Sequence, residues 1–201
     1  MFTGIIQALG TIAAIDTHGA DRRLRIATGK LDLGATKIGD SIAVNGVCLT
    51  AVELTGDGFW ADVSAETLSC TTLIDMAVGA AVNLEQALTP STALGGHLVS
   101  GHVDGVGAVV ERHDDARSVR LRITAPAVLA RYIAAKGSIC VDGVSLTVNA
   151  VQGADFELNI VPHTLQETTL GEFAPGRRVN LEVDIIARYL ERLLESRMGE
   201  A

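Results

Sequence analysis

The sequence contains an internal duplication, which limits the folds open to it more than any other feature does. When the chain is shifted against itself by 97 residues, residues 4–87 align with residues 101–184 without a gap, and 26 of the 84 paired residues are identical. Chains of average composition agree by chance at roughly 5–7% of positions. Solenoid repeats are far shorter than this period. The 201 residues are therefore predicted to form two related domains, each of a size that supports its own hydrophobic core.

The matched segments have the residue pattern of short β-strands. Apolar and polar residues alternate in RLRI at 23–26, which recurs at 120–123. Gly56-Asp57-Gly58 and Gly153-Ala154-Asp155 lie at matching positions, as hairpin turns should. About six such strands per copy favour an antiparallel barrel, because a flat sheet of that size would leave unpaired edges. The predicted fold class is all-β: tandem duplicated antiparallel β-barrels of about six strands each, with a C-terminal α-helix.

Two segments lie outside the repeat. ALTPSTALGG at 87–96 is rich in Pro, Ser, Thr and Gly and is predicted to be the linker. From residue 185 onward the chain has a helical pattern that either covers its own second barrel or holds copies of the chain together. The domain prediction is 1–97 for the first barrel and linker, 98–186 for the second barrel, and 187–201 for a C-terminal oligomerisation helix. The apolar stripe of this helix consists of Ile186, Tyr189, Leu190, Leu193 and Leu194.

Composition and charge exclude several classes of partner. The net charge is −8, and the sequence has no basic stripe that would favour nucleic acid or an anionic membrane. The MFTG start lacks the basic segment of a signal peptide, and no apolar run reaches membrane-spanning length. The three cysteines show no CxxC spacing, which favours reduced thiols over disulfides or a zinc site. We therefore expect a cytoplasmic protein with no nucleic-acid partner, no membrane partner and no metal.

Glycines and histidines gather in the segment GGHLVSGHVDG, midway along the chain. Metal ligation, a phosphate loop, a catalytic base and a plain linker would all suit such a segment. Under the shift Gly101 falls on Gly4, so the segment leads into the second copy and is not a phosphate loop. Metal ligation is disfavoured because no familiar ligand set has suitable spacing. His97 lies before the repeat and His102 aligns with Ile5, and each is either a structural or a functional histidine.

Several paired positions carry different functional groups in the two copies. A shared scaffold would hold the same ligand twice, whereas differing groups would let the two ligands play different chemical parts. Cys48 is either such a group or a small buried hydrophobic residue. The pairs that differ are Cys48 and Ser145, Asp62 and Asn159, Glu66 and His163, Gly39 and Lys136, and Ala87 and Asp184.

Five motifs together resemble riboflavin synthase, the alpha-type family with two lumazine-binding repeats. They are MFTGII, NGVCLT, GGHLVSGHVDG, KGSICVDGVSLTV and TLQETTLG, and the resemblance covers essentially the whole chain. It implies two Greek-key barrels, a homotrimer assembled by the C-terminal helix, and no metal or organic cofactor. It also implies that two molecules of 6,7-dimethyl-8-ribityllumazine dismutate, one giving a four-carbon unit to the other, to yield riboflavin and 5-amino-6-(ribitylamino)uracil. Association with lumazine synthase is a further partner that the resemblance leaves open.

The resemblance assigns active-site residues by matching motif. A reaction between two copies of one substrate requires two sites that bind the same molecule but differ in their reactive groups, and the duplicated domain supplies them. Cys48 matches the active-site cysteine of the family, as nucleophile or as proton relay. His102 matches the active-site histidine and is the natural base, because imidazole exchanges protons near neutral pH. The other implied active-site residues are Ser41, Thr67, Ser145, Thr147 and Asp184.

The resemblance also implies which residues bind the lumazine, largely through backbone groups at strand ends. In the first barrel these are Gly4, Ile5, Ile6, Cys48, Leu49, Thr50, Asp62, Val63, Ser64, Ala65, Glu66 and Thr67. In the second barrel they are Gly101, His102, Val103, Lys136, Ser145, Leu146, Thr147, Ile160, Val161, Pro162, His163, Thr164 and Leu165. The reactive site is expected between the first barrel of one subunit and the second barrel of a neighbour, with Cys48 and His102 from different chains.

The alternative on the same scaffold is a non-catalytic lumazine- or flavin-binding antenna protein. Relatives of that kind bind the fluorophore without turning it over and are expected to have lost the active-site cysteine. Cys48 and His102 are both present here, which favours the enzyme. One residue departs from the family pattern: Ala51 follows NGVCLT where Val is usual, while the second copy keeps Val148. We interpret this difference as a change in packing.

Overall fold

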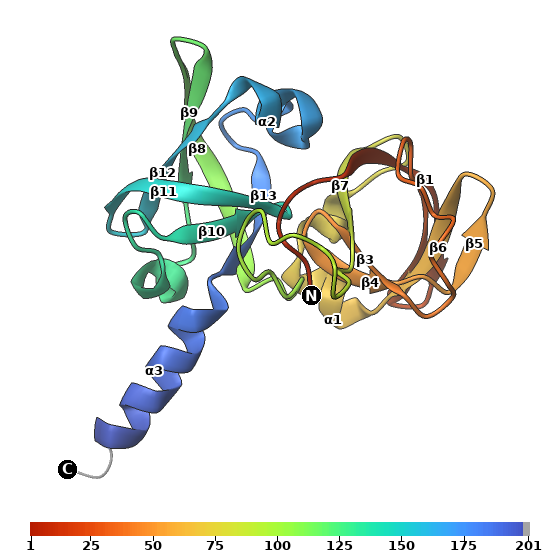
Figure 1. The fold of residues 1–201 in the computed structure, drawn as a ribbon, viewed down its shortest axis with the longest axis horizontal. Helices are drawn as coiled ribbons and strands as arrows, with labels where there is room; N and C mark the ends of the chain where they lie inside the picture. The colour runs from red at the N-terminus through yellow and green to blue at the C-terminus, as the bar shows by residue number, and fades with distance from the viewer. Residues whose placement is uncertain (199–201) are drawn as a thin grey trace.

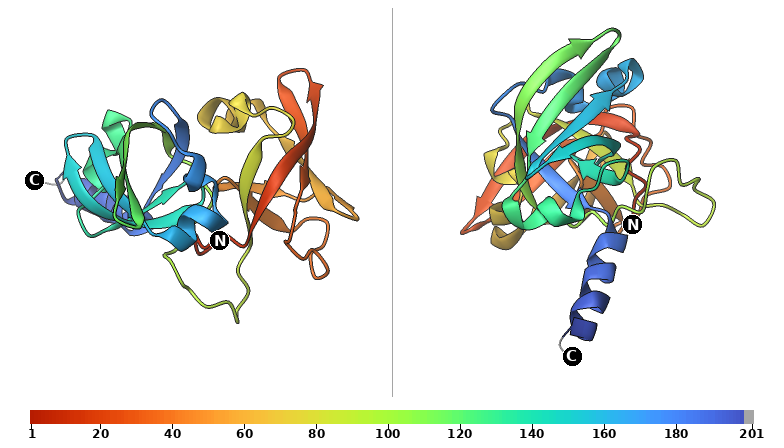
Figure 2. Two further views of the ribbon diagram at one scale, coloured as in Figure 1. Left: turned by 90° about the horizontal axis from the view of Figure 1, so that it is seen from above. Right: turned by 90° about the vertical axis from the view of Figure 1, so that its left-hand side faces the viewer.

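The computed structural model describes residues 1–198 and shows two barrels side by side, followed by a C-terminal helix (Figure 1). The first repeat forms β1 (Ala8–His18), β2 (Asp21–Ala27), β3 (Ser41–Val44), β4 (Val47–Thr50), β5 (Glu53–Thr55), β6 (Gly58–Val63), α1 (Ala65–Cys70), η1 (Thr72–Asp75) and β7 (Ala81–Gln86). The second repeat forms β8 (Gly105–Asp115), β9 (Ser118–Thr124), η2 (Ala127–Tyr132), β10 (Ser138–Val141), β11 (Val144–Gln152), β12 (Asp155–Ile160), α2 (Pro162–Glu167), η3 (Thr169–Glu172) and β13 (Arg178–Val183). The helix α3 spans Ile185–Met198, and the predicted linker bows away from the barrels (Figure 2). The predicted duplicated all-β architecture is confirmed.

The two repeats follow the same path through their barrels. The second is a closed barrel with strand order β10-β11-β12-β9-β8-β13. The first is a seven-stranded sheet, β4-β3-β7-β1-β2-β6-β5, because the strand that matches β11 is divided into β4 and β5. At the division, the backbone of Ala51 bonds to residues 39 and 40, and the backbone of Val148 bonds in the same way to residues 136 and 137. The smaller side chain therefore leaves the path of the chain unchanged.

Each barrel has a separate apolar core built from the inward-facing side chains of alternating residues. In β2, Leu24 and Ile26 are fully buried, while the residues between and beside them are partly exposed. Leu121 and Ile123 repeat this pattern in β9. Each repeat therefore packs around its own core, and the two are joined by polar contacts together with a small apolar cluster at the seam.

The barrels meet at two tight turns that face each other. A Cβ on Gly46 would lie 2.7 Å from the backbone of the facing turn, so only glycine permits this approach. Asn180 donates a side-chain N–H to the carbonyl of Asn45 at 2.9 Å, and Asn83 donates to the carbonyl of Asp142 at 2.8 Å. These reciprocal bonds fix the orientation of one barrel relative to the other.

The junction carries a buried acid on one side only. Asp142 stands where the first repeat has Asn45. Its Oδ1 accepts the backbone N–H of Asn180 at 2.7 Å, whereas its Oδ2 has no hydrogen-bond partner among the described residues. Complete burial raises the pKa of Asp142 to about 7, although the Asn180 N–H and the Arg177 guanidinium oppose this shift. The neutral Asn45 shows that the turn itself needs no charge at this position.

The helix α3 contacts its own barrel through polar side chains. Glu191 forms an ion pair with the guanidinium of Arg131 at 2.8 Å and accepts a hydrogen bond from the hydroxyl of Tyr132, both from η2. The predicted apolar stripe is instead 50–67% exposed, and the helix points away from both barrels (Figures 1 and 2). Within this chain, half or more of the surface of each stripe residue is therefore left uncovered by the barrel. Residues 199–201 of the predicted helix lie outside the described chain.

None of the helices within residues 1–198 is long and apolar enough to cross a membrane.

We predict that the free energy of unfolding of the native protein falls as pH rises from about 4 to about 7, and that Asp142→Asn abolishes the part of this fall that Asp142 causes. The folded carboxyl stays protonated to about pH 7, while the unfolded carboxyl ionises above about pH 4. Rising pH therefore favours the unfolded native chain across this window, by about 4 kcal/mol for a difference of about three pKa units. Urea denaturation of both proteins at several pH values measures the difference. The other titrating groups are common to both chains. A difference in free energy of unfolding between the variant and the native protein that does not change with pH would therefore contradict the prediction.

Candidate functional site

The residues that lead into each repeat lie against the other repeat's barrel. We call residues 1–6 and 98–103 the leading segments. The amide of Cys48 donates to the carbonyl of Gly101 at 2.9 Å, and the amide of Ser145 donates to the carbonyl of Gly4 at 2.7 Å. The two leading segments also pair with each other through an antiparallel bridge between residues 2 and 99. The resemblance grouped Gly4 with the first barrel's site and Gly101 with the second's. In the structure, each glycine instead contacts the opposite barrel.

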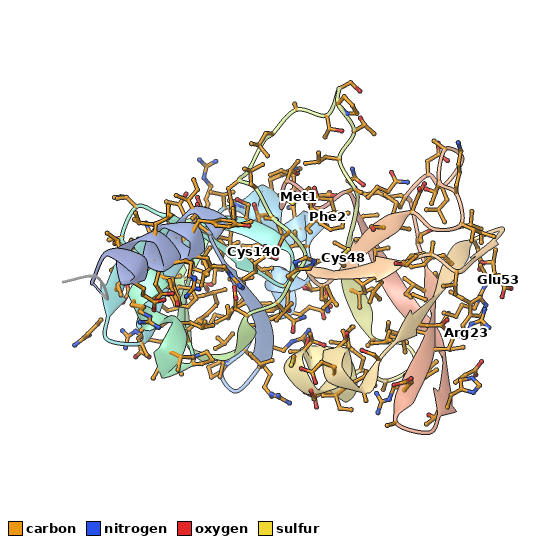
Figure 3. All side chains as sticks on the ribbon, turned by 90° about the horizontal axis from the view of Figure 1, so that it is seen from below. Met1, Phe2, Arg23, Cys48, Glu53 and Cys140 are labelled. Carbon is orange, nitrogen blue, oxygen red and sulfur yellow. The ribbon has the colours of Figure 1, made fainter. Side chains whose placement is uncertain are left out.

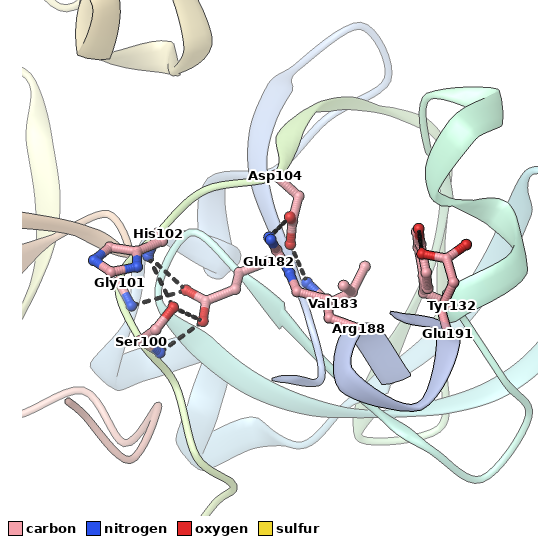
Figure 4. A network of polar contacts seen from close by, with 9 residues as sticks. All are labelled: Ser100, Gly101, His102, Asp104, Tyr132, Glu182, Val183, Arg188 and Glu191. Carbon is pink, nitrogen blue, oxygen red and sulfur yellow. Dashed lines mark hydrogen bonds and ion pairs between the residues drawn. The ribbon is translucent and has the colours of Figure 1, made fainter. Parts of the chain in front are cut away.

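A buried glutamate holds each leading segment in place. Glu85 in β7 accepts the N–H and the hydroxyl of Thr3 through Oε1, at 2.7 and 2.6 Å, and the N–H of Gly4 through Oε2 at 2.9 Å. Glu182 in β13 accepts the equivalent groups of Ser100 and Gly101 at 2.6–2.9 Å (Figure 4). Burial raises the pKa of Glu85, and these donors partly oppose the shift. Sequence reasoning missed both residues as site elements, although the VNLE motif in each copy was a signal.

Glycine is required where each leading segment meets the opposite barrel. Gly101 has φ +80°, and a Cβ there would lie 2.7 Å from the Cβ of Cys48. Gly4 has φ +74°, and a Cβ there would lie 2.6 Å from the Cβ of Ser145. The two matched glycines therefore serve both a left-handed backbone and a close approach.

Cys48 lies in β4 at the seam between the barrels. It is partly buried and packs against a small cluster that includes Phe2, Val99 and Cys140. Figure 3 shows Phe2, Cys48 and Cys140 together where the two barrels meet. Cys140 is fully buried, and this burial raises the pKa of its thiol well above the usual value. The partial exposure of Cys48 keeps its thiol accessible in a way that Cys140 is not.

His102 immediately follows the residue that bonds to Cys48. Its amide is held at 3.1 Å by Glu182, and its exposed side chain lines a cavity of about 450 Å³. The wall of this cavity also includes residues of α3, among them Arg188 and Tyr189. Within one chain, Cys48 and His102 thus belong to one neighbourhood. The resemblance instead implied that the reactive site takes them from different chains.

His97 belongs to the other neighbourhood, beside Ser145. Its Nδ1 lies 2.7 Å from the hydroxyl oxygen of Ser145, and its amide donates to the carbonyl of Thr3 at 3.1 Å. The ring is buried, and Nε2 has no partner among the described residues. Burial lowers the pKa of His97, while the carboxylates of Asp184 and Glu182 partly oppose the shift. Sequence reasoning could not distinguish a structural from a functional role for His97, because this residue has no counterpart in the first repeat.

The remaining predicted residues lie at matching corners of the two barrels. Asp62 and Val63 end β6, and Ser64 begins α1 by accepting the amide of Thr67 at 3.2 Å. Ile160 ends β12 in the second barrel, and Val161, Pro162, His163, Thr164 and Leu165 lead into and form most of α2.

Five further predicted residues lie in or beside the strands of the two barrels. Ser41 begins β3 and lines a cavity of about 260 Å³ with Ala87. Lys136 is exposed with φ +68°, at the position where the first repeat has Gly39. Thr50 and Thr147 lie at equivalent positions of β4 and β11. Asp184 accepts the amide of Ile186 at 3.0 Å and so caps the start of α3.

The described residues contain no cluster of three or more His, Cys, Asp or Glu that would hold a metal ion.

Comparison with known proteins gives one consistent set of relatives. A family model described as the lumazine binding domain matches the chain twice, at residues 3–87 and 100–184. A riboflavin synthase from Photobacterium phosphoreum is 54% identical over 96% of this chain and 89% of the relative. One from Mycobacterium bovis is 47% identical over 98% of this chain and 99% of the relative. The crystal structure of LumP complexed with riboflavin has a TM-score of 0.85 at 28% identity, covering 91% of this chain and 99% of that one.

We predict that Gly101→Ala destabilises the protein more than Gly153→Ala, by about 2 kcal/mol or more. Both glycines have a positive φ, but a Cβ on Gly153 would meet no atom within 4 Å, whereas one on Gly101 would collide with Cys48. The control variant therefore reports only the backbone strain, about 1–2 kcal/mol. Urea denaturation at equal protein concentration gives both values. Equal costs would show that the close approach to Cys48 is not tightly packed.

Proposed function

The chain belongs to the riboflavin synthase family, and from that premise we propose how its two barrels divide the work of forming riboflavin. It is an enzyme with a transferase-type reaction. Two molecules of 6,7-dimethyl-8-ribityllumazine dismutate, and the transfer of a four-carbon unit yields riboflavin and 5-amino-6-(ribitylamino)uracil. One observation carries our proposal: each leading segment lies against the barrel of the other repeat. This exchange builds two neighbourhoods with the same backbone arrangement and different reactive groups.

We propose that each neighbourhood binds one lumazine. The first consists of residues 48–50, 62–67 and the second leading segment at 101–103. The second consists of residues 145–147, 160–165 and the first leading segment at 4–6, together with Lys136. Backbone groups at the strand ends of each neighbourhood bond the pteridine edge and the ribityl hydroxyls, which the two lumazines have in common. The side chains that differ between the neighbourhoods make one lumazine the donor and the other the acceptor.

The reactive groups of the first neighbourhood are Cys48 and His102. The exposed imidazole of His102 takes a proton from the acidic C7 methyl group of a lumazine. The accessible thiol of Cys48 adds to a ring carbon or relays a proton beside it. In the second neighbourhood, His97 stays neutral because of its burial, and its 2.7 Å contact orients the hydroxyl of Ser145 toward the bound ring. Ser41, Thr67, Thr147 and Asp184 complete the proposed polar surroundings.

We propose that the reaction takes place between two subunits of a cytoplasmic homotrimer. Holding two rings in contact replaces a bimolecular encounter, so the two kinds of neighbourhood must face each other. The exposed apolar stripe of α3 supports self-association, since several large side chains there are half or more exposed. The functional units are then residues 1–97, 98–186 and 187–201. The chemistry uses no metal or organic cofactor in this proposal, and association with lumazine synthase is a separate question of assembly.

The antenna alternative has less support. The likeness to LumP complexed with riboflavin supports ligand binding by the fold, at 28% identity. The identity to riboflavin synthases is higher, at 47–54%. Cys48 and His102 also lie next to each other through Gly101, an arrangement for which a protein that only binds its ligand has no evident use.

We predict that Cys48→Ser slows riboflavin formation by at least about tenfold, which corresponds to about 1.4 kcal/mol of transition-state stabilisation. Lumazine affinity should stay nearly unchanged, because Ser145 occupies the same position in the second barrel and makes the same backbone bond. Riboflavin absorbance measures turnover, and lumazine fluorescence measures binding. Undiminished turnover in the variant would remove any chemical role for the thiol, and absence of turnover in the native protein would favour the antenna alternative.

We predict that mixing a Cys48→Ser chain with a Lys136→Gly chain restores activity, because each brings the intact neighbourhood that the other lacks. Lys136→Gly removes the side chain from the second neighbourhood without straining the backbone. Gly39 stands at the matching position of the first repeat, and Lys136 has a positive φ, which glycine adopts readily. A mixture of Cys48→Ser with His102→Gln should show no recovery, because both residues belong to the first neighbourhood. Native mass spectrometry confirms subunit exchange in each mixture. Recovery in the second mixture alone would overturn this assignment.

A further inference from the structure

Asp104 connects the segment that carries His102 to α3. Its side chain is only 8% exposed and forms an ion pair through Oδ1 with the guanidinium of Arg188. Its other carboxylate oxygen, Oδ2, accepts the backbone N–H of Val183 at 2.8 Å. Figure 4 shows Asp104 between Val183 and Arg188, with His102 on the same stretch of chain. One nearly buried carboxylate therefore joins three elements: the leading segment, β13 and α3.

The first repeat shows which of these bonds the barrel itself needs. Gln7 occupies the position that matches Asp104, and its Oε1 accepts the N–H of Gln86, the residue that matches Val183, at 2.9 Å. A neutral amide thus performs the backbone contact in one repeat as the carboxylate does in the other. The charge and the second oxygen of Asp104 are additional, and they bind α3, an element that the first repeat lacks.

The contacts continue from Asp104 to the backbone of His102. His102 is two residues before Asp104, and Glu182, which holds the His102 amide, directly precedes Val183 in β13. Arg188 and His102 line the same cavity of about 450 Å³. A displacement of α3 relative to the barrel would therefore act on His102 through the ion pair and through the wall of the cavity.

We propose that Asp104 and Arg188 are positioning residues, whose ion pair sets the place of His102 relative to α3. Through this pair, docking of the exposed face of α3 on another subunit also fixes the reactive imidazole. The inference rests on the proposed function, because it assigns to the imidazole of His102 the proton transfer described above. Because the Asp104 carboxylate is nearly buried, removing Arg188 leaves an uncompensated charge out of water, which is more costly than losing one partner of a surface ion pair.

The experiment compares Asp104→Asn and Arg188→Gln with Glu191→Gln as the matched control. Asp104→Asn keeps an oxygen for the N–H of Val183, as Gln7 does for Gln86, and removes only the ion pair. Glu191→Gln weakens the other polar attachment of α3, at Arg131 and Tyr132, on the side of the helix away from His102 (Figure 4). For each variant we would measure kcat and KM for the lumazine, the assembly mass by light scattering, and the ring resonances of His102 by NMR.

We expect Asp104→Asn and Arg188→Gln to lower kcat about five- to tenfold, because small displacements of a reactive group are costly. KM should change by less than about twofold, and the assembly mass should not change. The double variant should be no slower than either single one, Arg188→Lys should recover part of the loss, and Glu191→Gln should keep the native kcat. The His102 resonances should shift in the first two variants and not in the control.

Two results would overturn the inference. An equal loss of kcat in all three variants would mean that the pair only attaches the helix, and native kcat with native His102 resonances in Asp104→Asn would mean that the pair does nothing for the imidazole. The NMR comparison holds whether or not the native protein turns over lumazine. A protein without turnover would therefore contradict the proposed function, while the resonances would still decide whether the ion pair positions His102.

Discussion

The buried carboxylates of Glu85 and Glu182 are the interactions on which the rest of the site depends. Each accepts consecutive backbone N–H groups of a leading segment, at 2.6–3.1 Å, and so bends that segment across the seam onto the opposite barrel. A carboxylate removed from water is costly unless its lone pairs are satisfied, and here both oxygens have donors. The closeness of Gly101 to Cys48, and of Gly4 to Ser145, follows from this arrangement. Neither neighbourhood is therefore complete in a single repeat.

Much of the fold could be predicted from the sequence because its signals are local. The alternation in RLRI and the glycine turns each act over a few residues and occur in both copies. The helical stripe after residue 185 is equally local, although it lies outside the repeat. The exchange of the leading segments could not be predicted in this way. A shift of 97 residues aligns Gly4 with Gly101, but it contains no information about which barrel each one contacts. Placing them requires the long-range bonds to Cys48 and Ser145, and the same holds for His97, which has no counterpart to align.

The duplication also separates what the fold requires from what one repeat has added. Two acids of the second repeat accept a backbone N–H that a neutral amide accepts in the first repeat. Gln7 makes the contact that Asp104 makes, and Asn45 makes the contact that Asp142 makes, so the fold itself needs no charge at either position. The additional charge of Asp104 meets Arg188. The additional charge of Asp142 meets no side-chain donor for its Oδ2, so burial keeps the group protonated at the pH where most carboxyls are ionised. The two acids therefore differ in kind, since one forms a contact that the first repeat lacks and the other adds a cost at the junction.

The helix α3 reverses the usual arrangement of an amphipathic helix. Its polar side chains face its own barrel, through Glu191 and Arg188, while its large apolar side chains are exposed. Burying a large aliphatic side chain contributes about 1.5–3 kcal/mol, so two or three of them provide enough free energy to hold subunits together. In the proposed trimer, the polar contacts would link this association to His102. They run from α3 to Asp104, which lies two residues after His102. In the proposed trimer, α3 would therefore carry both the apolar face that joins subunits and Arg188, the ion-pair partner of Asp104.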